Sequence, residues 1–150
     1  MRYMIEFVNV IPNEVEEKMY KDMVKYEYNH GIDVNYKQFS LILTEDSNEV
    51  VGVLKAYTAF AEVYIDELWV DSSHRRKGHG RKLMQELENH FHGKGFNNIN
   101  LVTSNFQAPG FYLKCGFTAE FVRINKKHPN LTKTFFIKYF TEELQTQGIL

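Results

Sequence analysis

A strand, a basic turn that contains two glycines, and an amphipathic helix follow one another between residues 63 and 92. Residues 63–70 are rich in β-branched and aromatic side chains, which favours a strand. In residues 80–92, four apolar side chains recur at helical spacing and so share one face: Leu83, Met84, Leu87 and Phe91. A strand that leads through a short turn into such a helix predicts an α/β domain, in which the helix covers a sheet.

Six further segments are predicted as strands, because β-branched and aromatic residues concentrate in them between polar or glycine-containing turns. They are residues 3–10, 39–44, 50–60, 98–103, 117–124 and 134–140. The polar run 45–49 separates two of them and predicts a hairpin. A short helix is predicted over 109–114, where Pro109 starts it and Gly116 follows its end.

The segment after Pro12 is predicted to be a helix with one apolar face. Val15, Met19 and Met23 recur every four residues, which places them on the same side of a helix. Burial in the core is the simplest reason for such a stripe. Strands and helices then alternate along the chain, which predicts an α/β fold, a three-layer α-β-α sandwich around a mixed sheet.

Length and composition predict one globular domain over residues 1–150. A chain of 150 residues is long enough for one core and short for two. It has three prolines, no internal repeat and no low-complexity tract, so no segment resembles a linker between domains. Residues 141–150 are predicted to be a polar tail or a short helix, with no function assigned.

Charge and cysteine content narrow the function classes. The formal net charge is −1, so no overall field attracts nucleic acid or an anionic membrane, and any basic site must be local. The single cysteine, Cys115, can form no internal disulfide and is interpreted as a small buried residue. We find neither a secretory signal nor the roughly 18 consecutive apolar residues of a membrane span. A cytoplasmic protein without nucleic-acid or membrane partners is therefore expected.

The turn between residues 70 and 80 has the composition of a phosphate site. It contains the pattern Arg75-x-x-Gly78-x-Gly80 immediately before the helix. Glycines allow a ligand to approach the backbone closely, and the amides at a helix N-terminus carry partial positive charge. No Walker A sequence is present, and a dinucleotide fingerprint would need glycine where Leu83 stands. The alternatives are a solvated basic turn, a nuclear-localisation signal or a nucleic-acid patch.

A second run further along the chain contains an asparagine, an alanine and the sequence Phe-Tyr-x-Lys-x-Gly-Phe. These are Asn105, Ala108 and residues 111–117. With both runs in this order, the chain resembles the GNAT family of N-acetyltransferases over nearly its whole length. The resemblance implies a sheet that splays at its centre, between the strands 63–70 and 98–103. It also implies acetyl-CoA as the acetyl donor and no metal.

The resemblance implies roles for individual residues. The turn and the start of the helix would wrap the pyrophosphate of coenzyme A through backbone amides and basic side chains: Arg75, Arg76, Lys77, Gly78, His79, Gly80 and Arg81. The backbone of Leu68, Trp69 and Val70 would pair with the pantetheine arm. Asn105 would contact the cofactor, and Tyr112 would lie near its sulfur.

Acetyl transfer to an amine needs a neutral nitrogen, a positioned carbonyl and a stabilised leaving group. An amine with a pKa of about 10.4 is mostly protonated at neutral pH, so a base or a water path must remove its proton. Asp66 and Glu67 are candidate bases, or else surface carboxylates, and strand alternation is expected to send only one of them into the cleft. Tyr112 is the candidate acid for the departing thiolate, or else a core aromatic. The resemblance implies that a backbone amide near Trp69 or Val70 would meet the oxyanion.

The sequence therefore predicts transfer of an acetyl group from acetyl-CoA to a primary amine of a small molecule, peptide or protein, by direct attack in a ternary complex. The alternative is an acyl-CoA-binding sensor or interaction module with little catalysis. The identity of the acceptor and the oligomeric state, a homodimer included, are left open. Candidates for the acceptor site, by position in the chain alone, are residues 125–133, Tyr26, Tyr28, His30 and Tyr36.

Overall fold

The computed structural model describes residues 1–141, which fold as two compact units. The first unit is residues 1–34, and the second begins at Asn35. The single domain over residues 1–150 stays a prediction, and the tail predicted for 141–150 lies, after Thr141, outside the described residues.

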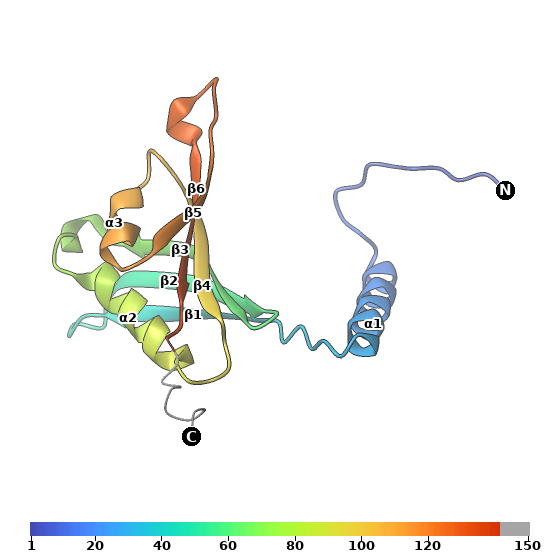
Figure 1. Ribbon diagram of the computed structural model, residues 1–150, viewed down its shortest axis with the longest axis horizontal. Helices are drawn as coiled ribbons and strands as arrows, with labels where there is room; N and C mark the ends of the chain where they lie inside the picture. The colour runs from blue at the N-terminus through green and yellow to red at the C-terminus, as the bar shows by residue number, and fades with distance from the viewer. Residues whose placement is uncertain (142–150) are drawn as a thin grey trace. The chain divides into compact units, whose positions relative to one another are not determined.

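The first unit contains the helix α1 (Asn13–Asn29), which the sequence predicted (Figure 1). Pro12 precedes it with a φ of −57°, and Glu14 and Glu16 place negative charge in the first turn, where the helix dipole is positive. The prediction of a strand over 3–10 was wrong, because these residues form neither helix nor strand. A strand needs a neighbour for its backbone hydrogen bonds, and none of the described strands pairs with this segment.

The apolar stripe of α1 is exposed in the structure. Val15, Met19 and Met23 are 47%, 46% and 53% exposed, and no residue within α1 is buried. No other part of residues 1–34 covers this stripe, so its burial in a core stays a prediction. A spacing of four residues fixes which side chains share a helix face, but it does not determine what covers that face.

The second unit is built on a mixed sheet with strand order β1-β2-β3-β4-β6-β5 in the described residues. The strands are β1 (Lys37–Thr44), β2 (Val50–Ala59), β3 (Glu62–Val70), β4 (Asn98–Ser104), β5 (Thr118–Arg123) and β6 (Lys133–Tyr139). β3 and β4 pair in parallel, and the other neighbours pair antiparallel. The predicted hairpin and the predicted mixed α/β architecture are confirmed.

Two helices, α2 (His79–Phe91) and α3 (Pro109–Lys114), lie on the same face of this sheet (Figure 1). The predicted apolar face of α2 is buried: Leu83, Met84, Leu87 and Phe91 are between 0% and 8% exposed. These side chains pack against strand residues such as Leu54, Ile65 and Leu101, and Phe111 and Tyr112 of α3 pack against the same core. The core therefore fixes α2 and α3 relative to the centre of the sheet.

The sheet splays between β3 and β4, as expected. Their ladder is limited to Glu62↔Asn98, Val63↔Ile99 and Tyr64↔Asn100, after which the two strands diverge. A β-bulge follows in β3: Lys55 of β2 faces Glu67, whereas the next residue of β2 faces Ile65, so Asp66 is the extra residue. The divergence and the bulge begin at the same level of the sheet.

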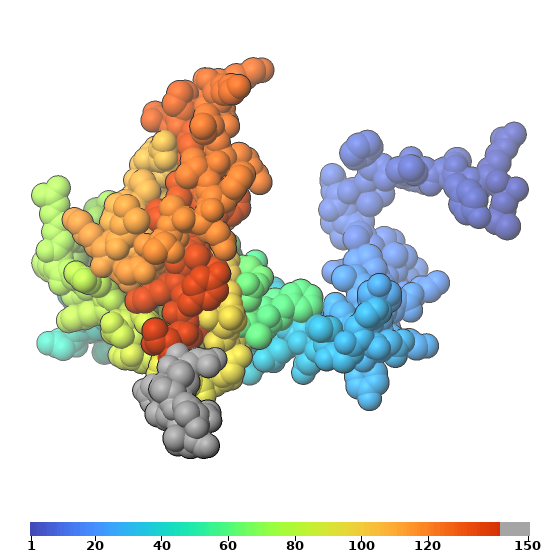
Figure 2. Space-filling model, in the orientation of Figure 1, coloured from blue at the N-terminus to red at the C-terminus, as the bar shows by residue number. Residues whose placement is uncertain are grey.

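The connection between β5 and β6 contains a short 3-10 turn, η2 (Pro129–Leu131), and projects beyond the body of the second unit (Figures 1 and 2). Ile124 and Leu131 in this projection are 70% and 44% exposed. A role of residues 125–133 at the acceptor site stays a prediction. In the described residues, no helix has the length and apolar character that crossing a membrane requires.

Candidate active site

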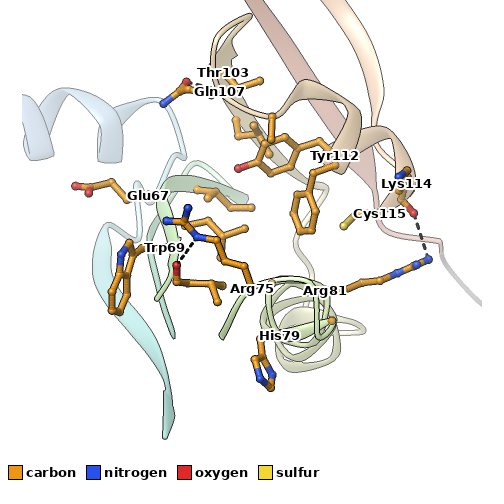
Figure 3. A pocket seen from close by; sticks show the side chains of 18 of the residues that line it. Glu67, Trp69, Arg75, His79, Arg81, Thr103, Gln107, Tyr112, Lys114 and Cys115 are labelled. Carbon is orange, nitrogen blue, oxygen red and sulfur yellow. Dashed lines mark hydrogen bonds between the residues drawn. The ribbon is translucent and has the colours of Figure 1, made fainter. Parts of the chain in front are cut away.

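The divergence of β3 and β4 opens a cavity of about 730 Å³ (Figure 3). Its walls are the carboxyl-terminal halves of both strands, the turn before α2, the first residues of α2, and α3. The sequence-predicted site residues that line it are Asp66, Glu67, Leu68, Trp69, Val70, Arg75, Arg76, Gly78, His79, Gly80, Arg81 and Tyr112. The fold therefore brings two distant sequence motifs to one cavity.

Hydrogen bonds to neighbouring elements hold the turn before α2. The carboxylate of Asp71 accepts from the backbone N–H of Ser73 at 3.1 Å, and the N–H of Asp71 donates to the carbonyl of Val51 in β2 at 2.8 Å. Nδ1 of His74 lies 3.2 Å from Asp71, and Nε2 lies 3.0 Å from Glu45 in the β1–β2 turn. Hydrogen bonding to Asp71, and then to Glu45, raises the pKa of His74. The imidazole therefore ties the turn to the hairpin beside it, and does so most strongly when it is charged.

Two glycines open the start of α2 to the cavity. Gly78 adopts a φ of 81°, a left-handed conformation that favours glycine, and no described side chain caps the helix that begins at His79. A Cβ at Gly80 would lie 3.2 Å from Cζ of Phe111, so the absence of a side chain lets α2 approach α3 closely. The first amides of α2, which have no intrahelical partner, are left for an anion.

Basic side chains surround this helix end, which we call the basic end of the cavity (Arg75 to Arg81). Nε of Arg75 donates to the carbonyl of Val70 at 2.9 Å, and Nη2 of Arg81 donates to the carbonyl of Lys114 at 3.3 Å, as the dashed lines in Figure 3 show. Guanidinium groups suit phosphate oxygens because of their fixed charge and several donors. The basic end therefore combines amides, a helix dipole and cations.

The gap between the strands is lined from both faces of the sheet. On the face covered by helices, Leu68 packs against the core and Thr103 is 5% exposed. Strand alternation sends Glu67, Trp69 and Val102 to the opposite face, where Trp69 is 44% and Val102 47% exposed. We call the part of the cavity around Asp66, Glu67 and Trp69 the carboxylate end. A molecule in the gap is therefore accessible from the basic end and from the opposite face of the sheet.

The bulge changes what alternation predicted for the two carboxylates. Asp66 and Glu67 both line the cavity, whereas only one was expected to face it. The extra residue at Asp66 interrupts the alternation of side chains, so alternation cannot decide between the two carboxylates, and the expectation that only one faces the cavity stays a prediction. Nζ of Lys55 lies 3.4 Å from Oε1 of Glu67, and the two side chains are 53% and 66% exposed. This exposed pair holds Glu67 weakly, so its carboxylate can exchange partners.

Tyr112 projects from α3 into the cavity (Figure 3). Its ring meets Phe111 and Phe117 edge to face, and no described residue forms a hydrogen bond with its hydroxyl. Burial, with a smaller contribution from Cys115, raises the pKa of Tyr112. Burial likewise raises the pKa of the Cys115 thiol, which is protonated at neutral pH and a poor nucleophile. Tyr112 therefore offers a neutral hydroxyl donor to the interior of the cavity.

A family model, described as the acetyltransferase (GNAT) family, matches residues 5–117 and so includes both motifs and the strands between them. The chain belongs to the GNAT family. It is an acetyltransferase of that family, and its relatives in sequence and structure carry the same description of activity.

The relatives include proteins of comparable size. Blasticidin-S acetyltransferase of Streptomyces morookaense is 29% identical over 94 residues, which are 62% of this chain and 68% of the relative. The crystal structure of an acetyltransferase from Bacillus cereus ATCC 14579 is 29% identical with a TM-score of 0.71, and covers 92% of this chain and 99% of its own. An aminoglycoside 6'-N-acetyltransferase complexed with coenzyme A shares the fold, with a TM-score of 0.61 at 18% identity over 93% and 99% of the two chains.

Two residues that the GNAT resemblance assigned to the cofactor lie outside the cavity lining: Lys77 and Asn105. Nδ2 of Asn105 donates to the carbonyl of Pro129 at 3.5 Å, and its backbone N–H donates to Thr132 at 2.9 Å. Asn105 thus connects the end of β4 to the projecting β5–β6 loop. Cofactor contact by Lys77 and Asn105 stays a prediction.

Sequence reasoning missed several polar residues of this GNAT cavity, two of which, Thr103 and Gln107, contact each other. Oε1 of Gln107 accepts from Oγ1 of Thr103 at 3.1 Å and from the N–H of Ser104 at 2.8 Å. Gln107 lies inside the second motif, at a position that the family pattern does not specify, and Thr103 looks like any other strand residue. The sequence carries no signal that would have selected either one.

Proposed function

We propose that this GNAT protein transfers the acetyl group of acetyl-CoA to a primary amine by direct attack within a ternary complex. One observation carries the proposal: the gap between β3 and β4 joins the basic end of the cavity to Glu67 on the opposite face of the sheet. Tyr112 lies between these two regions. A thioester in the gap would then be accessible to an amine that enters from the carboxylate end.

The basic end fits the pyrophosphate of coenzyme A. Gly78 and Gly80 leave the amides of α2 open, and Arg75, Arg76 and Arg81 line the same end of the cavity. Backbone groups of β3 beyond Tyr64 have no partner in β4, so the strand can pair with the amides of the pantetheine arm. Nε of Arg75 holds the carbonyl of Val70 and would exchange this contact for the ligand. Bound acetyl-CoA supplies the activated acetyl group.

Glu67 is the better candidate for the base. It lies on the open face of the sheet, where an amine would arrive, and within residues 1–141 its ion pair is the exposed contact with Lys55. Asp66 is the extra residue of the bulge, so the direction of its side chain is set by the local backbone and not by the alternation of side chains along the strand. We assign proton removal from the acceptor amine to Glu67, directly or through a water molecule.

Tyr112 is assigned as the hydrogen-bond donor to the departing sulfur. The raised pKa of Tyr112 keeps its hydroxyl protonated at neutral pH, so the donor is always present. A thiolate with a parent pKa of roughly 8.5 takes a proton from tyrosine only at a cost, because tyrosine is the weaker acid. The main contribution of Tyr112 is therefore stabilisation of the developing negative charge.

A small, basic molecule is the class of acceptor that we favour. The relative from Streptomyces morookaense is named for its action on blasticidin S, and access to Glu67 through an open sheet face suits a compact ligand. Asp66 and Glu67 give the entry to the gap a negative charge, which attracts an amine that arrives protonated.

Calorimetric titration with acetyl-CoA tests the proposal, run beside a Gly78→Asp, Gly80→Asp double variant. The wild type is expected to bind acetyl-CoA, and the double variant to lose binding. The two new carboxylates would occupy the space of the pyrophosphate and would repel its negative charge. A Gly93→Asp, Gly95→Asp variant is the control, since it introduces the same two carboxylates outside the cavity, at glycines that have positive φ, 75° and 88°, as Gly78 does.

Transfer is then measured with a panel of amines, by release of the free thiol of coenzyme A. Binding together with amine-dependent thiol release supports the proposed enzyme. Binding without release for any amine would favour an acyl-CoA-binding module, and absence of binding by the wild type would refute the proposal.

A further inference from the structure

Trp69 presents an exposed aromatic side chain at the carboxylate end of the cavity. Its side chain is 44% exposed, although large aromatic side chains contribute most to stability when they are buried. Among residues 1–141, no ring stacks on the indole and no hydrogen bond involves its Nε1. The cation–π contact found in these residues is Arg123 over Phe135, which does not involve Trp69 or the cavity lining. Within residues 1–141, the exposed indole therefore has no aromatic, cation–π or hydrogen-bonding partner.

The position of Trp69 separates it from the proposed cofactor contacts. Its backbone belongs to the strand edge proposed for pantetheine, but its side chain lies on the opposite face of the sheet, two residues beyond Glu67. Figure 3 shows Glu67 and Trp69 side by side on that face. The face of an indole attracts cations, and carboxylates nearby add to this attraction. The chemistry of the carboxylate end thus suits a flat, positively charged group.

We propose that Trp69 is a specificity residue that binds a planar cation, such as a guanidinium, on the same molecule as the amine to be acetylated. This inference rests on the proposed function and names the class of its acceptor. Residues two apart in a strand are about 6.6 Å apart. If the amine lies at Glu67, the planar cation lies at about that distance, over the indole of Trp69.

Agmatine has suitable dimensions, because its amine and its guanidinium are about 7 Å apart when the chain is extended. Two matched compounds keep the four-carbon chain: butane-1,4-diamine carries a compact ammonium in place of the guanidinium, and butylamine carries no second cation. Trp69 is the single tryptophan of the chain, so intrinsic fluorescence reports on this residue alone.

The experiment titrates the protein, saturated with coenzyme A, with each of the three amines. Agmatine is expected to quench the fluorescence saturably, more strongly than the diamine, and butylamine not at all. By calorimetry, Trp69→Leu should weaken agmatine binding about five- to tenfold, and Trp69→Phe should retain most of it, because a ring remains. Tyr139→Leu removes another exposed aromatic, 58%, outside the cavity and should change nothing.

Equal binding of agmatine and butylamine, or unchanged agmatine binding in Trp69→Leu, would overturn this inference while acetyl-CoA binding and acetyl transfer stood. The absence of saturable quenching by agmatine in the wild type would overturn it as well, even if Trp69→Leu did not fold. Absence of acetyl-CoA binding by the wild type would instead refute the proposed function, so a failure of this inference can be distinguished from a failure of the proposed function.

Discussion

The two ends of the cavity are built in different ways. The basic end depends on backbone conformation: Gly78 at positive φ, Gly80 against Phe111, and a turn held by Asp71 and His74. The carboxylate end depends on side chains that project from β3 into open space. Backbone requirements restrict the residues that can stand at a position, whereas an exposed side chain is free to vary. This difference would allow enzymes of one fold to share the acetyl donor and to differ in the acceptor.

The largest effect is expected for Glu67→Gln, which keeps the shape of the side chain and removes the base. Turnover should fall by about 100-fold or more, a typical contribution of general base catalysis, while the affinity for acetyl-CoA stays the same. Steady-state kinetics and calorimetry measure the two quantities separately.

Asp66→Asn is the matched control, because it neutralises the neighbouring carboxylate at the bulge. A larger loss of turnover in Asp66→Asn than in Glu67→Gln would transfer the role of the base to Asp66. Loss of acetyl-CoA affinity in either variant would show that the two ends of the cavity are not independent.

A smaller effect is expected for Tyr112→Phe, which removes the hydroxyl and keeps the ring contacts with Phe111 and Phe117. Turnover should fall about tenfold, because one hydrogen bond to the departing sulfur is lost, and acetyl-CoA binding should be nearly intact. Single-turnover measurements with a fixed acceptor give the rate of the chemical step. Unchanged turnover would remove Tyr112 from the mechanism.

At the basic end, the contribution of His74 to stability should depend on pH. The pKa of folded His74 is raised by Asp71 and Glu45, so the stabilisation is complete below about 6.5, the pKa of a free histidine, and is lost as pH rises through the raised value. Both carboxylates have lowered pKa values and are charged at pH 5.5. The difference in melting temperature between wild type and His74→Gln should therefore be larger at pH 5.5 than at pH 9.

His128→Gln removes an exposed histidine outside the cavity and serves as the control for this comparison. A melting difference for His74→Gln that is the same at both pH values would contradict a charged imidazole in the turn.

The smallest effect is expected for Lys55→Met. The pair between Lys55 and Glu67 is exposed and 3.4 Å long, so its loss should change stability by less than about 1 kcal/mol. Chemical denaturation measures this difference. An effect on turnover as large as that of Glu67→Gln would mean that Lys55 positions the base and is part of the carboxylate end.

Most of the second unit could be predicted from the sequence because local patterns there agree with burial. The face of α2 formed by Leu83, Met84, Leu87 and Phe91 packs on the sheet as its spacing indicated. Residues 3–10 have the composition of a strand, but composition does not supply a neighbouring strand. The same limit applies to α1, whose apolar stripe has the right spacing and no cover within residues 1–34.

The site divides in a similar way. Gly78, Gly80 and Tyr112 belong to motifs whose spacing is visible in the sequence, and the fold brings them to one cavity. The bulge at Asp66 is a property of the pairing between β2 and β3, so alternation read from the sequence alone could not take it into account. The turn after β4 brings Gln107 into contact with Thr103, and no spacing rule predicts that contact.

The splayed sheet has a consequence for the resistance of the protein to unfolding. The ladder between β3 and β4 amounts to three residue pairs, so it joins the two halves of the sheet weakly. A ligand that pairs with the free edge of β3 would complete this joint, and its binding free energy would add to the free energy of unfolding. At 100 times its Kd, such a ligand contributes about 2.7 kcal/mol. The supply of acetyl donor would then influence how long the folded enzyme survives, as well as how fast it works.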